Sequence, residues 1–141
     1  MNYCVFCKIV NRELPAEIID ETDKVVVILA LENHPLVVTR KHIKDVYELD
    51  EETGAEVMKE TIKVARATKE AIRPDGINLV QANELAAHQE VFHFHLHIKP
   101  RWHNDDVQMH WEPEAIDEST RAETRRKIVA ALRKQSNQSP E

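Results

Sequence analysis

Three histidines occupy every second position of the stretch VFHFHLHIKP, residues 91–100. They are His93, His95 and His97, and apolar residues fill the positions between them. This period of two predicts a β-strand over 91–98 with one buried face and with the imidazoles in a row on the other, about 6.5–7 Å apart. An imidazole attacks phosphorus well when a neighbour fixes its tautomer, and it also binds zinc. The row therefore favours nucleophilic chemistry on a phosphate, or a zinc site with an open water position, over a solvated polar face.

A second candidate for chemistry is the Cys-x-x-Cys pair near the N-terminus, formed by Cys4 and Cys7. Two thiolates at this spacing, joined by two histidines from elsewhere, would make a closed tetrahedral zinc site. A thioredoxin-like redox pair needs a strand before its first cysteine, and residue 4 has none. Plain core cysteines are the other alternative. The pair therefore favours metal binding over redox chemistry.

Length and charge limit the class of protein. A chain of 141 residues predicts one domain, which we expect over 1–134, with the polar segment 135–141 as a disordered tail. A net charge of −6 argues against a broad nucleic-acid surface. There is no long apolar run and no signal-peptide pattern in the sequence, so we expect a soluble cytoplasmic protein without a membrane partner.

The elements that must position these side chains follow from hydrophobic periodicity and turn residues. Asp50 is a good N-cap for a helix that runs to residue 72, with an apolar stripe of Met58, Ile62, Ala65 and Ile72 and with Glu60 and Lys63 on the outer face. The other expected elements are a helical turn over 4–11, strands over 17–20, 25–31, 35–38 and 77–83, and a helix over 117–134. This order predicts an α+β fold with an antiparallel sheet of about five strands and two main helices.

Several motifs in the same order resemble the histidine-triad (HIT) superfamily of nucleotide hydrolases and transferases. They are CVFCKIVNRELPAEIIDETD, HPLVVTRKH, DGINLVQAN and QEVFHFHLHIKPRW, and the resemblance covers about residues 3 to 103. The chain resembles the small bacterial-type nucleoside phosphoramidate hydrolases more than the dinucleoside-triphosphate hydrolases. The resemblance implies a HIT-like fold, a homodimer and a small-molecule nucleotide substrate, with no organic cofactor.

The resemblance also implies roles for single residues. His95 matches the nucleophile, which attacks the α-phosphorus and forms a nucleotidyl-histidine intermediate. His97 matches the residue that orients and charge-balances it, and His34 a fourth histidine from the neighbouring strand. The residues that match the substrate-binding positions are Asn83, Gln89, Phe6, Ile28 and Leu31, and those that match a structural zinc site are Cys4, Cys7, His42 and His93.

Three residues depart from the family pattern around the site. Ala30 stands where an aspartate usually holds the ribose hydroxyls, His88 where a glycine is usual, and Glu90 where a serine commonly meets the phosphate. Lys99 or Arg101 could offset phosphate charge from the end of the strand. The altered positions leave open an alternative function, a non-catalytic, zinc-stabilised nucleotide-binding or adaptor protein on the same fold. A zinc hydrolase that uses the histidine row as ligands is a further alternative.

Overall fold

The structure is a computed structural model that describes residues 3–109 and 114–138. The chain divides into two compact units, with the boundary between residues 105 and 106, and each unit is described by itself. The domain limits expected from the sequence therefore stay a prediction.

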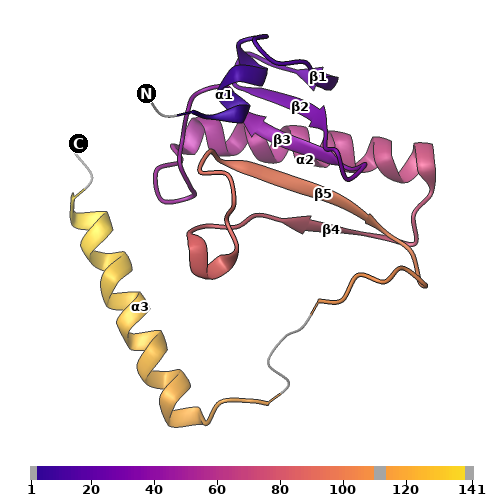
Figure 1. Cartoon of the computed structure of the whole chain (residues 1–141). Coiled ribbons are helices and arrows are strands. Elements are labelled where there is room, and N and C mark those ends of the chain that lie inside the picture. The colour runs from indigo at the N-terminus through magenta and orange to yellow at the C-terminus, as the bar shows by residue number, and fades with distance from the viewer. Residues whose placement is uncertain (1–2, 110–113, 139–141) are drawn as a thin grey trace. The chain divides into compact units, whose positions relative to one another are not determined.

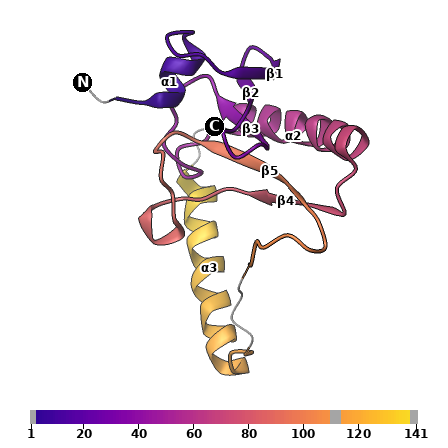
Figure 2. The same cartoon turned by 45° about the vertical axis from the view of Figure 1, so that its right-hand side comes forward.

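The first unit is built on a five-stranded antiparallel sheet with the order β1-β2-β3-β5-β4 (Figures 1 and 2). The strands are β1 Glu17–Glu21, β2 Val25–Leu29, β3 Pro35–Thr39, β4 Gly76–Val80 and β5 His95–Arg101. The helices of this unit are α1 Val5–Val10, α2 Glu51–Ile72 and the short 3₁₀ turn η1 Leu85–Ala87. Together with α3 Glu118–Gln138 they give the α+β class, with the five strands and two main helices that the sequence predicts.

The sheet buries both of its faces over β2 and β3. Val25 and Val27 pack with the α2 residues Val57 and Val64, while Val26 packs on the opposite face with residues that include Phe6 of α1. Strands with two covered faces read as continuous apolar runs rather than as an alternation. The sequences VVVIL and PLVVT are such runs.

The histidine strand begins later than expected. Residues 91–94 are irregular, and β5 starts at His95 and continues to Arg101. Phe94 and Ile98 are buried in the core on the α2 side. The predicted alternation is correct from His95 onward, but His93 lies before the strand.

The apolar stripe expected on α2 is correct only for Ala65, which packs against the core. Met58, Ile62 and Ile72 are 44–51% exposed, and the buried face instead includes Thr61 and Thr68. Each threonine hydroxyl donates to the carbonyl four residues earlier, at 2.7 and 2.8 Å, so burying it leaves no polar group unpaired.

The charges of α2 also differ from the expectation. Glu60 was expected on the outer face, yet it is buried beside Lys63 and Asp20. Burial is the main cause that raises the pKa of its carboxyl. Asp50 does cap the helix as predicted, accepting from the Thr53 amide at 2.8 Å.

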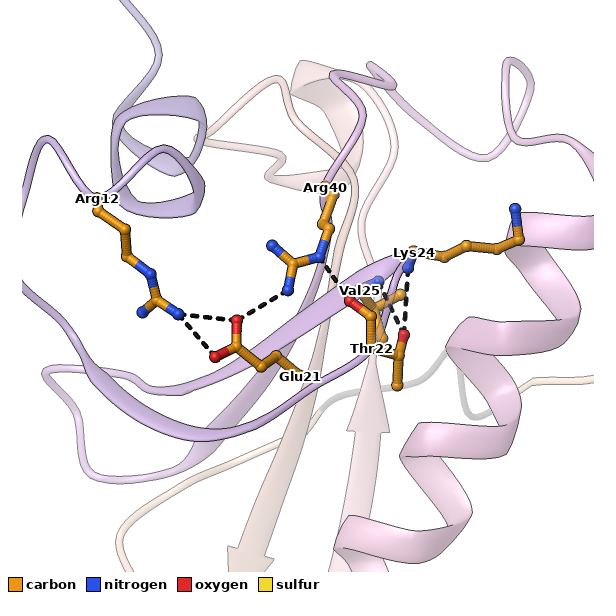
Figure 3. Close-up of polar contacts among 6 residues, drawn as sticks. All are labelled: Arg12, Glu21, Thr22, Lys24, Val25 and Arg40. Carbon is orange, nitrogen blue, oxygen red and sulfur yellow. Dashed lines mark hydrogen bonds and ion pairs between the residues drawn. The ribbon is translucent and has the colours of Figure 1, made fainter.

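An ion-pair network ties the loop after α1 to the sheet (Figure 3). Two Arg12 hydrogen bonds of 2.7 and 2.8 Å and one Arg40 bond of 2.8 Å end on the Glu21 carboxylate at the end of β1. Arg40 also donates to the Thr22 carbonyl. The two guanidiniums, Arg40 first, lower the pKa of Glu21. The network therefore helps to hold α1, which carries Cys7 and Phe6, against the sheet.

The second unit contains α3. The helix exposes Ile128 and Leu132, and none of its residues is buried. It continues to Gln138 and so overlaps the expected tail 135–141, whose last three residues lie outside the described part of the chain. Within the described residues, no helix is both long and apolar enough to cross a membrane.

We predict that replacing Glu21 with Gln lowers the melting temperature at pH 7 more than it does near pH 3. Because the folded-state pKa of Glu21 lies below its unfolded value, the network stabilises the fold above the unfolded pKa, and this is lost as pH falls through the folded pKa. Melting curves over this pH range test it, with Glu17→Gln at the other end of β1 as the control. An equal effect of Glu21→Gln at both pH values would contradict the prediction.

Candidate functional site

His93 is the fully buried residue around which the site is built. Its Nε2 lies 2.6 Å from the Thr39 carbonyl, and because a carbonyl can only accept, this nitrogen must carry the proton. The Nδ1 lone pair is then directed at two thiols, 3.3 Å from Cys4 Sγ and 3.5 Å from Cys7 Sγ. The hydrogen bond thus fixes the tautomer that a metal ligand needs.

Cys4, Cys7, His42 and His93 come together as the sequence predicts. Their four ligand atoms lie within 4.8 Å of one another, and Cys7 Sγ is 3.2 Å from His42 Nδ1. A tetrahedral zinc ion would separate such ligands by roughly 3.4–3.8 Å. Burial raises the pKa of the Cys7 thiol to about 11, so a bound metal must displace a proton. The donor set and its spacing fit a metal ion.

His95 lies beside this cluster and has its own fixed tautomer. Its Nδ1 is 2.7 Å from the backbone carbonyl of His93, so Nδ1 donates the hydrogen bond and Nε2 keeps its lone pair. The ring packs edge-on against Phe6, with centroids 4.9 Å apart. Burial lowers the pKa of His95, so the neutral form with a free Nε2 prevails at neutral pH. This arrangement is that of a nitrogen nucleophile.

His97 pairs with His34 across the β3–β5 register. His34 Nε2 and His97 Nδ1 are 2.8 Å apart, so one of these two nitrogens donates a hydrogen bond and the other accepts it. The tautomers of the two rings are therefore coupled. Burial, followed by the nearby positive charges, lowers the pKa of His97 to about 4.

This pairing changes the role expected of His97. His95 is oriented by the hydrogen bond that its Nδ1 donates to the His93 carbonyl, whereas His97 bonds to His34 and is neutral at neutral pH. The two rings still lie side by side, with centroids 5.1 Å apart. A direct part for His97 in the chemistry stays a prediction.

An apolar pocket of about 630 Å³ lies beside Phe6. This volume is in the range of small-molecule sites. Phe6, Ile28 and Leu31, the three apolar residues expected near a base, all line it, and so does Ala30. Glu17 and Glu32 are its charged lining residues, and the Glu32 charge acts on both His34 and His97.

Asn83 and Gln89 have contacts that differ from the expected ones. Gln89 is buried, accepts from the Glu84 amide at 2.8 Å and donates to the Lys44 carbonyl at 2.8 Å. The Asn83 side chain accepts from the Val46 amide and exchanges hydrogen bonds with Gln81. Both side chains therefore help to hold loops in place, and their expected contact with a substrate stays a prediction.

Two of the departures from the family pattern also have a structural account. His88 has φ 64°, the left-handed backbone that glycine adopts most easily, so the loop keeps the glycine conformation. Glu90 lines a second pocket, of about 520 Å³, together with Cys4 and His42 of the metal cluster.

The cations at the end of β5 are not equivalent. Arg101 is engaged by Asp105 and Asn78 at 2.7–2.8 Å. The charge of Lys99 acts on His34 and His97, which leaves Lys99 as the cation near the histidines.

The sequence matches the model of the HIT domain family over residues 11–104. The chain belongs to the HIT family. An adenosine 5'-monophosphoramidase of Schizosaccharomyces pombe is 34% identical, over 70% of this chain and 74% of the relative.

Solved structures of HIT proteins agree with this assignment. A HIT family protein of Bacillus subtilis has a TM-score of 0.86 at 29% identity, over 92% of this chain and 96% of that one. A zinc-bound histidine triad protein of Mycobacterium smegmatis has a TM-score of 0.70 at 33% identity, over 96% and 97%. The fold expected from the motifs is confirmed, and the family includes an enzyme that acts on a small nucleotide.

Sequence reasoning missed two parts of the site. The His93 carbonyl orients His95, yet no residue type reveals what a backbone atom will contact. Pro15, before β1, and Glu17, its first residue, line the apolar pocket, and only the fold brings them to Ile28. The Glu17 position gives no signal in the sequence, because it reads as an ordinary strand end.

We predict that His97 makes the fold less stable as pH falls from 6.5, its ordinary pKa, towards about 4. Between these values the unfolded chain binds more protons than the folded one, so the free energy of unfolding falls as the pH falls. Above pH 7 His97 is neutral in both states, and the effect vanishes. Urea unfolding at pH 7, 6 and 5 should show a shallower decrease for His97→Asn. The exposed His88→Asn is the control, and a slope unchanged in His97→Asn would refute this source of the pH dependence.

Proposed function

We propose that the chain is a nucleotidyl hydrolase or transferase in which His95 attacks the α-phosphorus of a nucleoside phosphoramidate or related nucleotide. The observation that carries this is the 2.7 Å hydrogen bond from His95 Nδ1 to the His93 carbonyl, which leaves Nε2 unprotonated. The phosphoramidase relative supports a substrate with a phosphorus–nitrogen bond. The roles of His95, His97 and His34 are part of this proposal.

The reaction has two steps. The Nε2 lone pair of His95 forms a bond to phosphorus while the bond to the leaving group breaks, and the leaving nitrogen takes a proton from solvent. The positive charge that develops on the imidazole is stabilised by the His93 carbonyl at Nδ1. Water then attacks the phosphorus, releases the nucleoside monophosphate and a proton, and restores His95.

The surroundings favour a ligand with one apolar and one anionic end. The pocket beside Phe6 offers an apolar surface to a base, and Lys99 supplies positive charge near the histidines. Ala30 lines the pocket with a methyl group, which accepts no hydrogen bond from a ribose. The hydroxyls of the substrate must therefore find another acceptor, and Glu32 and Glu17 are the carboxylates that line the pocket.

We also infer a structural zinc ion at Cys4, Cys7, His42 and His93. Two thiolates and two imidazoles form the Cys₂His₂ set of closed structural sites, and the zinc-bound relative supports zinc as the metal. Within the described residues no other group of three or more such ligands gathers, and only His93 of the row takes part. This argues against a zinc hydrolase built on the whole row.

A homodimer fits two exposed apolar features. Met58 and Ile62 stand out from α2, and Leu79 is half exposed on β4, an edge strand of the sheet. An apolar helix face and an open sheet edge are suited to pairing about a two-fold axis. The cytoplasmic location expected from the sequence stays a prediction.

We predict a covalent adenylyl adduct on His95. The protein is mixed with adenosine phosphoramidate, quenched early in acid and weighed by intact-mass spectrometry. His95→Ala should lose the adduct and slow AMP release by about three orders of magnitude or more, because no other group supplies the nucleophile. His103→Gln, an exposed histidine after β5, is the matched control. AMP binding without adduct or turnover would favour the non-catalytic nucleotide-binding alternative.

We predict about one zinc ion per chain in protein that has never met a chelator. Cys7→Ser should lose most of the metal, because a closed site needs all four ligands. His95→Ala, which lies beside the cluster but outside it, should keep the metal. Elemental analysis of purified protein measures the ratio, and a metal-free wild-type sample would refute the site.

A further inference from the structure

Helix α1 contacts both the metal cluster and the proposed nucleophile, His95. Cys4 caps α1 and Cys7 lies inside it, so the six-residue helix carries both thiols. Between them stands Phe6, whose buried ring contacts His95 at 4.9 Å and His93 at 5.9 Å between centroids. Whatever fixes α1 therefore also fixes one wall around the ring of His95.

His93 makes a second and more direct connection. Its Nδ1 faces the thiols, while its backbone carbonyl accepts the hydrogen bond from His95. The amide of the next residue, Phe94, donates to the Ile43 carbonyl at 2.6 Å, so the backbone here is held on both sides. The imidazole of His93 thus faces the metal cluster, and its carbonyl orients His95.

We propose that metal occupancy holds His95 in its reactive tautomer through His93, which acts as the positioning residue. With a metal bound, four strong ligand bonds tie α1 and His42 to His93. Without it, only weak S–H···N contacts of 3.2–3.5 Å join the thiols to these rings. The proposal rests on the proposed function for its catalytic meaning, but not for its structural content.

The consequence concerns which nitrogen of His95 carries the proton. When the His93 carbonyl is fixed at 2.7 Å from Nδ1, the proton stays there and Nε2 faces outward as a lone pair. When α1 loosens, the Phe6 ring loses its fixed place, and His93 keeps only its Thr39 and Ile43 contacts, so its carbonyl holds the Nδ1 proton of His95 less firmly. The ring then exchanges between tautomers, and a fraction of molecules has a protonated Nε2 that cannot attack phosphorus.

The test reads the tautomer itself. Long-range ¹H–¹⁵N correlation spectra of histidine-labelled full chain are recorded at one neutral pH, without substrate. Zn²⁺-loaded protein should show a single Nδ1–H tautomer for His95, and protein stripped of metal should show a mixture. An identical pure tautomer in folded, stripped protein overturns the proposal.

Two variants separate this effect from a general loss of stability. Val64→Ala opens a cavity in the core on the α2 face and leaves the cluster intact, so it should lower the melting temperature without changing the tautomer. A mixed tautomer in Zn²⁺-loaded Val64→Ala would overturn the proposal. His42→Asp keeps a weaker ligand, so in that variant the tautomer ratio should follow Zn²⁺ concentration while the far-UV spectrum stays constant. A ratio independent of Zn²⁺ in this folded variant also overturns it.

A kinetic readout connects the effect to catalysis. Removing the metal should slow single-turnover adenylylation by about tenfold or more, as loss of an orienting partner does, while AMP affinity changes little. An unchanged rate with weakened AMP binding would overturn the proposal, because the metal would then act on the pocket. If no adduct forms at all while the tautomer follows the metal, the proposed function fails and the positioning role of His93 stands.

Discussion

The hydrogen bond from buried His93 to the Thr39 carbonyl is the constraint on which the site depends. A buried imidazole is tolerated only when its polar atoms have partners, and this bond of 2.6 Å satisfies Nε2. It also decides that Nδ1 is the free nitrogen, and Nδ1 faces the two thiols. The end of β3, the start of β5 and α1 meet at this one ring. The rest of the site follows from the position in which they hold it.

The sheet explains why this meeting point is rigid. β2 and β3 are buried on both faces, by α2 on one side and by the cluster around Phe6 on the other. β5 has one apolar face, with Ile98 fully buried, and presents His95 and His97 on the other. Because one face of β5 is buried in the core, a shift of register would bury the imidazoles and expose the apolar residues. The core thereby fixes which histidine meets which neighbour.

Residue types alone predicted much of the sheet and part of the site. Alternation identified β5 from His95 onward, continuous apolar runs gave β2 and β3, and Asp50 marked the start of α2. The cysteine spacing favoured a metal site, and the resemblance to the family identified His42 and His93 as its other ligands.

The features that the sequence did not predict depend on backbone atoms and on polar side chains that hydrogen-bond within their own helix or loop. Thr61 looks polar in the sequence, but its hydroxyl bonds to its own helix and can be buried, so the predicted face of α2 was displaced. Gln89 looks like a phosphate ligand, but its amide is used by the carbonyl of Lys44, a position set only by the folded loops. Hydropathy and motif matching depend on residue types alone, so they do not predict hydrogen bonds to backbone carbonyls.

The histidines of the site also show what residue types alone cannot predict. They are the same residue type, yet the free ring nitrogen differs between His93 and His95 because the two rings donate to different acceptors. His93 gives its Nε2 proton to Thr39 and offers Nδ1 to a metal, whereas His95 gives its Nδ1 proton to a backbone carbonyl and offers Nε2 to phosphorus. His34 Nε2 and His97 Nδ1 share one hydrogen bond, so the tautomer of each ring depends on that of the other. The chemistry of the row is therefore set by the acceptors around it, so a change that moved a carbonyl by an ångström could exchange a ligand for a nucleophile without altering any histidine.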